Sequence, residues 1–401
     1  MYQFIPEGTI TSVQGFKSAG IFCGIKKQKK DLALIYSDTP CFAAGTFTLN
    51  KVVAAPNVIS KNIIKQQNRV RAILVNSGNA NACTGTKGFE NALESQSYLA
   101  KKLSINPTEV IISSTGVIGL QLPIDKLLNG IDKIIPELSE NGGDDSAEAI
   151  LTTDLRKKSF AVKVQLQEGE VIIGGICKGS GMIMPNMATM LAFLTTDASI
   201  ENTVLQKLLT NSVNETFNKI SVDGETSTND MVILLANGVS KIKVNEGTEN
   251  YSTFLNGLIA ICSEMAKAIV ADGEGATKLI TVSVNNAKTK EDANAVAKAV
   301  ANSPLVKTAM NGNDANWGRI LAAAGNSGVD FNPDKVTIKF DDLPVLLPNY
   351  NAGFSEDEVK RVLNKSEVTL FLDLNEGKES STWWTCDFSE NYVKINAGYR
   401  T

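Results

Sequence analysis

The middle of the chain reads K-G-S-G-M-I-M-P-N-M-A-T-M-L-A-F-L-T-T-D-A, from Lys178 to Ala198. Glycine and proline interrupt its first half, whereas most of its second half is apolar. This order is typical of a strained loop that leads into a buried strand, because glycine tolerates unusual backbone angles and a short apolar run favours a core strand. Thr189 lies at the junction, and we take it as the first candidate for chemistry.

The sequence of 401 residues contains no histidine. Catalytic sites of the Ser-His-Asp and Cys-His types are therefore excluded, since both use imidazole as the base. A hydroxyl nucleophile in this chain must find another base. One solution is an N-terminal threonine whose own α-amine accepts the proton, and it requires that the chain be cut immediately before that residue.

The composition predicts a globular protein that acts on small molecules. Apolar residues make up 43% and charged residues 20% of the chain, which suffices for a core, and the length predicts about two or three domains. The formal net charge of -4 gives no general attraction to nucleic acid or to an anionic membrane. The densest basic run, from Lys26 to Lys30, is interpreted as a solvated hairpin turn.

Neither the N-terminus nor the cysteines point to export or to a metal. The first residues, M-Y-Q-F-I-P-E-G, lack the basic and apolar regions of a signal peptide, and no window of eighteen residues is free of charges and breakers. The six cysteines form neither a CxxC pair nor a tight cluster, as is typical of reduced thiols. We therefore expect a cytoplasmic protein without a metal site or a membrane span.

Helix-like and strand-like segments are mixed without the regular alternation of a doubly wound fold. Strands are predicted over Ala72–Asn76, Val110–Ser114, Ala161–Leu166, Val171–Gly175, Met231–Ala236, Leu279–Val284 and Val368–Leu372. Helices are predicted over Gly88–Leu103, Pro123–Leu138, Thr203–Lys219, Phe254–Val270 and Glu291–Ser303. This mixture favours a layered α+β sandwich, with a domain boundary near Asp272–Lys278.

Clusters of small residues follow several predicted strands, and one of them is a candidate for catalysis. The cluster S-S-T-G-V-I-G begins at Ser113, directly after a strand. Such clusters usually form tight turns or helix caps. Thr115 and Gly116 nevertheless stand out, because a turn at the end of a strand can aim a hydroxyl and a backbone N–H into a cleft. Two such donors make an oxyanion hole.

Two other segments resemble ligand-binding motifs, but neither matches the complete pattern. The glycine-rich segment Gly174–Gly181 contains K-G-S in place of the G-K-[ST] that ends a phosphate-binding loop, so a nucleotide-binding module is the weakest alternative. The acidic segment Ser221–Asp230 does not complete a calcium loop. The polar side chains of this segment are explained by turn capping, and the alternative is that the segment is a loop that lines a site.

Taken in order, these segments resemble the ornithine acetyltransferase family, also called glutamate N-acetyltransferases, of arginine biosynthesis. The likeness runs nearly end to end and includes G-T-F-T-L-N-K-V-V-A-A-P from Gly45, S-G-N-A-N-A-C-T-G from Ser77, the segment from Lys178, and the final Y-V-K-I-N-A-G-Y-R-T. The resemblance implies an α/β/β/α sandwich of the self-processing N-terminal-threonine type, with a smaller α+β C-terminal domain.

The resemblance also implies how the chain is processed and what it does. A precursor would cut itself between Ala188 and Thr189 into an α fragment, 1–188, and a β fragment, 189–401, with a C-terminal subdomain from about 279–401. Two α and two β fragments would form a cytoplasmic heterotetramer. Thr189 would carry the acetyl group of N2-acetyl-L-ornithine to L-glutamate in arginine biosynthesis.

The site residues follow from the same resemblance. Thr115 and Gly116 are expected to stabilise the oxyanion. Contacts to substrate are expected from Thr152, Lys178, Thr189, Glu274, Asn396 and Thr401. No cofactor is implied, and the sequence leaves open whether acetyl-CoA is a co-substrate. The alternative is a self-processing aminopeptidase or amidase of similar fold, in which water replaces glutamate. Its usual nucleophile is serine, so Thr189 argues against it.

Overall fold

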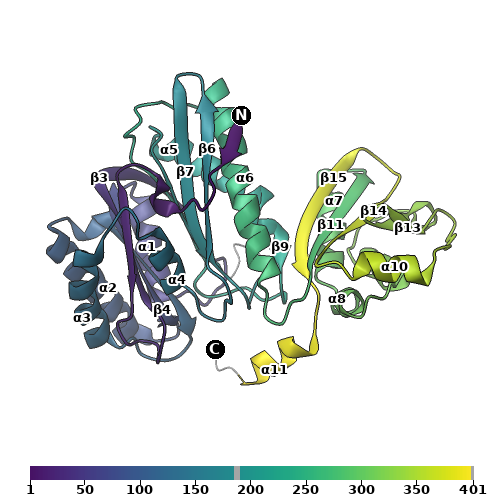
Figure 1. Ribbon diagram of the computed structural model, residues 1–401, viewed down its shortest axis with the longest axis horizontal. Coiled ribbons are helices and arrows are strands. Elements are labelled where there is room, and N and C mark those ends of the chain that lie inside the picture. The colour runs from purple at the N-terminus through teal and green to yellow at the C-terminus, as the bar shows by residue number, and fades with distance from the viewer. Residues whose placement is uncertain (185–189, 399–401) are drawn as a thin grey trace. The chain divides into compact units, whose positions relative to one another are not determined.

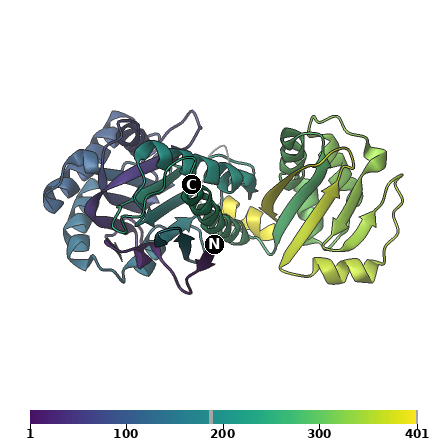
Figure 2. The same ribbon diagram turned by 90° about the horizontal axis from the view of Figure 1, so that it is seen from above.

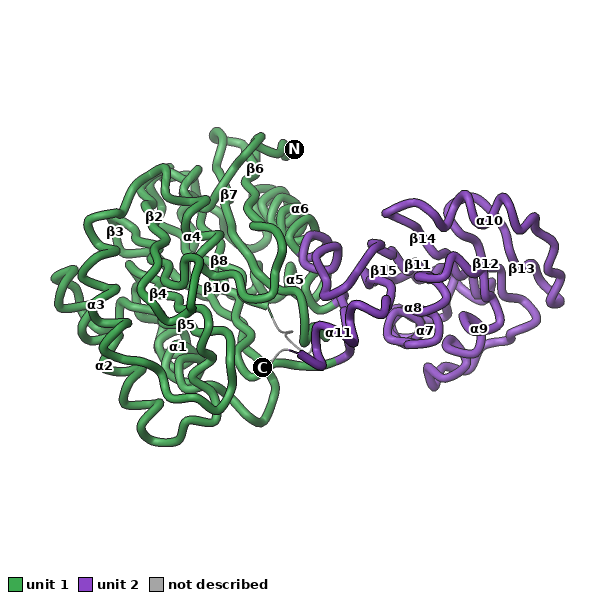
Figure 3. The backbone as a smooth tube through the Cα atoms, turned by 60° about the horizontal axis from the view of Figure 1, so that its bottom comes forward, with its two compact units in different colours: residues 1–218, 225–265, 400–401 green, residues 219–224, 266–399 purple. Residues whose placement is uncertain are grey.

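The computed structural model describes residues 1–184 and 190–398, which divide into two compact units (Figure 3). Among these residues, unit 1 comprises 1–218 and 225–265, and unit 2 comprises 219–224 and 266 onward. The division falls inside one long helix, α6, Glu249–Ala271. Each unit has a sheet of its own.

Unit 1 is built on a sheet with nine strands among the described residues, in the order β1-β6-β7-β8-β10-β3-β4-β5, with β2 paired to β3. The strands are β1 (Tyr2–Phe4), β2 (Phe16–Ile21), β3 (Leu32–Phe47), β4 (Val70–Asn79), β5 (Val110–Val117), β6 (Lys158–Leu166), β7 (Gly169–Lys178), β8 (Leu191–Thr196) and β10 (Met231–Ala236). The pair β4 and β5 is parallel, and so is the pair β8 and β10.

The long strand β3 belongs to both layers of this sheet. Its first half pairs with β2 and β4, and its second half pairs with β10. The register with β4 shifts between Tyr36 and Cys41, across the polar stretch S-D-T-P. Because such an irregularity bends a strand, β3 can pass from one layer to the other.

Helices cover the outer faces of the two layers, as Figure 1 shows for α2 and α3 on one side and α6 on the other. One group packs on β2 to β5 and comprises α1 (Ala55–Lys65), α2 (Gly85–Leu103), α3 (Ile124–Ile134) and α4 (Gly143–Ala149). On the other layer, α5 (Asn202–Glu215) packs on β3 and β10, and α6 packs on β6. The predicted α/β/β/α sandwich is confirmed.

The strands β8 and β10 form the centre of the core of unit 1. All twelve of their residues are buried. Both faces of these strands are covered, which explains why each reads as a continuous apolar run. The apolar run that follows Thr189 in the sequence therefore forms β8, and β10 has the bounds predicted from the sequence.

The glycine run before Lys178 serves close packing. Gly174 and Gly175 lie within β7, where a Cβ on Gly174 would come 2.4 Å from the carbonyl oxygen of Thr9. A strand paired on both sides leaves no loop to wrap a phosphate, so this part of the run does not bind nucleotide.

Among the described helices, α6 alone has the length and apolar composition to cross a membrane. A buried helix of a globular core passes the same test. The packing favours that second explanation, because Gly257 lies so close to β6 that a Cβ on it would be 2.4 Å from Val164. Half of the most apolar window of α6 is buried.

Unit 2 has a six-stranded sheet in the order β13-β12-β14-β11-β15-β9, whose strands run side by side in Figure 2. The strands are β9 (Ile220–Ser221), β11 (Leu279–Ala287), β12 (Thr337–Phe340), β13 (Leu343–Leu346), β14 (Glu367–Asp373) and β15 (Glu379–Cys386). Its further helices are α7 (Lys290–Ala301), α8 (Pro304–Asn311), α9 (Trp317–Gly325), α10 (Glu356–Leu363) and α11 (Glu390–Gly398). Apolar residues of β11, β12, β14, α7, α9 and α10 share one core.

Candidate active site

The end of β5 presents the two predicted oxyanion-hole residues. Thr115 and Gly116 pair in register with Ser77 and Gly78 of the parallel strand β4. Gly116 has φ = +131°, and a Cβ on it would lie 2.4 Å from the carbonyl carbon of Gly78, so only glycine fits there. Thr115 is 8% exposed, and within the described part of the chain its hydroxyl makes no hydrogen bond. This hydroxyl can therefore donate to a ligand.

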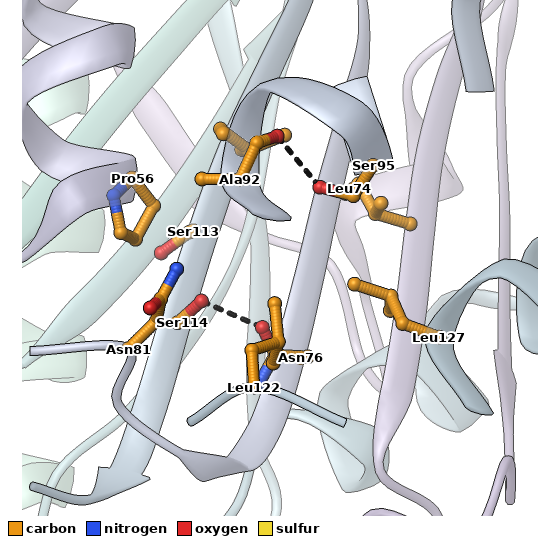
Figure 4. A pocket seen from close by; sticks show the side chains of 11 residues that line it. Pro56, Leu74, Asn76, Asn81, Ala92, Ser95, Ser113, Ser114, Leu122 and Leu127 are labelled. Carbon is orange, nitrogen blue, oxygen red and sulfur yellow. Dashed lines mark hydrogen bonds between the residues drawn. The ribbon is translucent and has the colours of Figure 1, made fainter. Parts of the chain in front are cut away.

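Polar side chains hold this strand end from behind. The Ser114 hydroxyl donates to Asn76 Oδ1 at 2.6 Å, and both residues line a small cavity together with Ser113 (Figure 4). The cavity has a volume of about 10 Å³. Space of this size admits at most one water molecule. A substrate cannot enter here, and the cavity belongs to the support of β5.

The segment Glu225–Asp230 connects the end of β5 to the residue that follows Thr189. Asn229 Nδ2 donates to the carbonyl oxygens of Ser114, at 2.8 Å, and Ala80, at 2.7 Å. The next residue, Asp230, accepts at Oδ1 a hydrogen bond of 3.1 Å from the Met190 N–H. Burial raises the pKa of Asp230 well above its usual range. The segment thus lines the end of β5.

Asp154 organises a buried cluster that contains Thr152 and Lys178. Its carboxylate accepts hydrogen bonds from the backbone of Thr152, at 3.1 Å, and Gly179, at 2.7 Å. It also lies 2.8 Å from Lys158 Nζ and 3.8 Å from Lys178 Nζ. Lys178 Nζ in turn donates to the Thr152 hydroxyl at 2.8 Å. Two of the predicted substrate contacts, Thr152 and Lys178, are therefore brought together.

The charges of this cluster explain the state of Asp154, whose side chain is fully buried. Burial by itself would raise its pKa, but the charges of Lys178 and Lys158 and the hydrogen bond from Lys158 outweigh burial and hold the pKa well below its usual range. The carboxylate therefore stays ionised at neutral pH. Asp154 was not among the residues predicted from the sequence, although its position two residues after Thr152 was a usable signal.

We expect Asp154→Asn to lower the free energy of unfolding by about 3–5 kcal/mol, because it removes one partner of a buried ion pair. The midpoint of urea unfolding at pH 7 measures this. Because the pKa of Asp154 is lower in the folded than in the unfolded chain, its carboxylate stabilises the fold above about pH 4, and this stabilisation is lost as the pH falls. The difference in unfolding free energy between Asp154→Asn and the unsubstituted protein should therefore shrink in acid. Asp144→Asn is the control, since its ion pair with Lys157 is exposed. Equal effects of the two substitutions would contradict the prediction.

The basic run forms the connection of the β2–β3 hairpin, as predicted, but it is not solvated throughout. Lys27 and Lys29 are exposed, but Lys26 is half-buried and its Nζ donates to the carbonyl oxygen of Leu151 at 2.8 Å. The side chain of Lys26 passes over Gly78, where a Cβ would come 2.7 Å from Lys26 Cγ. Lys26 thus lies next to the strand end that carries Gly116. No signal in the sequence indicated this, because it depends on contacts between distant segments.

Two further predicted substrate contacts lie together in unit 2. Asn396, on α11, donates to Glu274 Oε2 at 2.9 Å. Glu274 is 7% exposed, in the loop after α6. The neighbouring Gly275 has φ = +71°, and a Cβ on it would lie 2.4 Å from the Tyr392 nitrogen of α11. Glycine at this position lets α11 approach the loop that carries Glu274.

Three predicted residues, Ala188, Thr189 and Thr401, lie outside the described residues. The described residues on either side of the central gap contact the same polar segment. Thr226 Oγ1 donates to the Met184 carbonyl oxygen at 3.0 Å, and the Met190 N–H donates to Asp230. Within residues 1–184 and 190–398, no three acidic, cysteine or histidine side chains gather as a metal ion would require.

Comparison with known proteins gives one consistent family. The sequence model of the ArgJ family matches residues 17–401. The arginine biosynthesis bifunctional protein ArgJ of Bacillus cereus is 46% identical over 398 residues, which cover 99% of this chain and 98% of that protein. The protein of the same name from Caldanaerobacter subterraneus is 47% identical, over 99% of this chain and 100% of that protein.

A solved structure adds a likeness in three dimensions. The crystal structure of arginine biosynthesis bifunctional protein ArgJ from Bacillus halodurans superposes with a TM-score of 0.51 at 42% sequence identity. The match covers 98% of that chain but only 52% of this one.

Proposed function

The chain belongs to the ArgJ family, and on this premise we propose that it moves the acetyl group of N2-acetyl-L-ornithine to L-glutamate in arginine biosynthesis. The observation that carries the proposal is the hydrogen-bonded segment Glu225–Asp230. It contacts Ser114, next to the candidate oxyanion-hole residues, and Met190, next to Thr189. An acyl-transfer site needs these two parts, a nucleophile and oxyanion donors, close together.

Processing would supply the base that a chain without histidine lacks. The Thr189 hydroxyl attacks the Ala188 carbonyl carbon, the bond between Ala188 and Thr189 breaks, and water opens the resulting ester. This leaves a carboxylate on Ala188 and a free α-amine on Thr189. An α-amine has a pKa of about 7.7–8.0, so a useful fraction is neutral and can accept the hydroxyl proton at neutral pH.

The extent of the solved relative supports this processing. Its chain corresponds to 52% of this one while 98% of its own length is matched. The proposed β fragment, residues 189–401, is likewise slightly more than half of the 401 residues. We propose the α fragment, 1–188, as the other product, and a cytoplasmic heterotetramer of two copies of each as the assembled enzyme.

Turnover would proceed by two displacements on Thr189. Its hydroxyl attacks the acetyl carbonyl of N-acetylornithine, ornithine leaves with the proton that the α-amine accepted, and an acetyl ester remains. The amine of glutamate then attacks this ester and frees the hydroxyl. Thr115 and Gly116 would stabilise the oxyanion in each step. The name of the relatives, bifunctional protein, supports a second acetyl donor, for which we propose acetyl-CoA.

A direct assay separates this proposal from a hydrolase. We expect purified protein to release ornithine from N-acetylornithine in amounts that depend on added glutamate, with N-acetylglutamate formed in equal amounts. Mass spectrometry of the reaction mixture measures both products. Release of ornithine and acetate at the same rate without glutamate would favour the aminopeptidase or amidase alternative, and no release at all would refute both.

A further inference from the structure

The loop before β3 holds Lys26 in a fixed place. Asp31, which is fully buried, accepts backbone hydrogen bonds from Cys23 at 2.6 Å, Gly24 at 3.1 Å and Lys26 at 2.9 Å. Three N–H donors on one carboxylate form a compact, rigid turn. The carboxylate of Asp31 is thus occupied by the backbone, and it makes no ion pair with the Lys26 side chain within the described part of the chain.

The ammonium group of Lys26 reaches the same loop as that of Lys178. Lys26 Nζ donates to the Leu151 carbonyl oxygen, and Lys178 Nζ donates to the hydroxyl of the next residue, Thr152, each at 2.8 Å. The charge of Lys178 also lowers the pKa of Lys26, as expected of two cations that lie near each other. The two ammonium groups therefore lie near each other and contact the adjacent residues 151 and 152.

Among the residues that the structure describes, the side chains around Lys26 and Lys178 carry more positive than negative charge. Asp154 is the carboxylate next to Lys178, and it also pairs with Lys158. Lys26 has no ion pair among the described residues, and burial lowers its pKa to about 8, with Lys29 and Lys178 adding to the shift and Asp31 and Asp154 opposing it. An ammonium group has three donors, and Leu151 takes one. A bound anion would use the others and restore the charge balance.

We propose that Lys26, together with Lys178, binds the α-carboxylate that the acetyl donor and the acetyl acceptor share. This inference rests on the proposed acetyl transfer between N-acetylornithine and glutamate. The position fits, because the α-carboxylate is attached to the carbon that bears the reacting nitrogen, and Lys26 passes over Gly78, the register partner of Gly116.

The chemistry of the two substrates excludes the side-chain end of the substrate as the ligand of Lys26. The side chain of ornithine ends in an ammonium group, which two lysines would repel, whereas that of glutamate ends in a carboxylate. A cluster of lysines at that end would favour one substrate and exclude the other. The α-carboxylate is the anionic group that both substrates carry, so one site of this kind serves both half-reactions.

Steady-state kinetics of Lys26→Met test the inference. A variant that cannot make one hydrogen bond to a charged group of its substrate binds that substrate about 10- to 100-fold more weakly. We therefore expect the KM values for N-acetylornithine and for glutamate to rise by about this factor, with little change in kcat, because the interaction is made equally in the ground and transition states. Lys26→Arg keeps the charge and should recover most of the affinity.

A donor without the carboxylate separates binding from structural support. N-acetylputrescine has the acetylated amine and the distal ammonium group of N-acetylornithine but no carboxylate. The inference requires that Lys26→Met leave kcat/KM for this donor within about twofold of the unsubstituted enzyme, so that the preference for N-acetylornithine falls. Lys27→Met removes the same charge from an exposed position of the same loop and should change neither donor's kinetics.

Other results would contradict either the role of Lys26 or the proposed function. Equal losses for both donors in Lys26→Met would assign Lys26 a purely structural role and overturn the inference, as would an unchanged KM for N-acetylornithine. If the Met variant does not fold, the same comparison is made with Lys26→Gln. If the unsubstituted enzyme transfers no acetyl group, the proposed function fails. Calorimetry then tests Lys26 separately, by comparing the affinity of glutamate for the unsubstituted protein and for Lys26→Met. Equal affinities would show that Lys26 does not bind the α-carboxylate.

Discussion

Thr189→Ala is expected to abolish both chain cleavage and acetyl transfer. The variant lacks the hydroxyl that we propose attacks the Ala188 carbonyl, so the α-amine proposed as the base would not be released. Loss of a covalent nucleophile lowers turnover by on the order of 10⁴- to 10⁶-fold, because the remaining groups cannot form the acyl intermediate. Intact-mass spectrometry should find a single chain near 42.9 kDa for the variant and two fragments for the unsubstituted protein.

Thr189→Ser is the matched control for this experiment. Serine keeps the hydroxyl and the free α-amine after cleavage, so this variant should be cut between Ala188 and residue 189 and should transfer acetyl groups at a reduced rate. Acetyl transfer by Thr189→Ala, or full activity of an uncut chain with the natural sequence, would refute the proposed nucleophile.

The sequence indicated the core strands well and the long strand β3 poorly. The run Met231–Ala236 is continuously apolar because both faces of β10 are covered, so its pattern alone defines the strand. β3, in contrast, contains the polar stretch S-D-T-P in its middle, which resembles a turn. It continues as one strand because β2 and β4 pair with its first half and β10 with its second. Such tertiary pairing cannot be read from local pattern.

The site shows the same division between local and tertiary information. Thr115 and Gly116 were singled out as a small-residue turn after a strand ending at Ser114, but in the structure both lie inside β5, which continues to Val117. Lys26 was missed, because its position beside β4 depends on the absence of a side chain at Gly78, a residue that is distant in the sequence and comes close to Lys26 only in the fold. A basic run is usually a solvated surface feature, and local sequence alone does not distinguish Lys26 from its exposed neighbours Lys27 and Lys29.

Gly116→Ala is expected to slow acetyl transfer by at least about 10²- to 10³-fold, the effect of losing one oxyanion donor. The new Cβ would lie 2.4 Å from the carbonyl carbon of Gly78 and 2.6 Å from the Asn79 nitrogen. These are backbone atoms, so β5 must move away from β4, and the Thr115 hydroxyl and the Gly116 N–H move with it. The proposed self-cleavage would pass through a similar tetrahedral oxyanion, so it should slow as well. A time course of intact masses after expression measures this.

Gly119→Ala is the control that distinguishes a displacement of β5 from the strain of placing alanine at a positive φ. Gly119 also has a positive φ, +82°, but no atom lies within 4 Å of the position of its Cβ. Alanine there incurs the penalty of a left-handed residue, about 1–2 kcal/mol, without moving the strand end. Activity should therefore survive in Gly119→Ala and be lost in Gly116→Ala at equal folded fractions, checked by thermal unfolding. Comparable activity of both variants would mean that the end of β5 does not hold the oxyanion, because a shift of this size at a donor cannot leave its hydrogen bond intact.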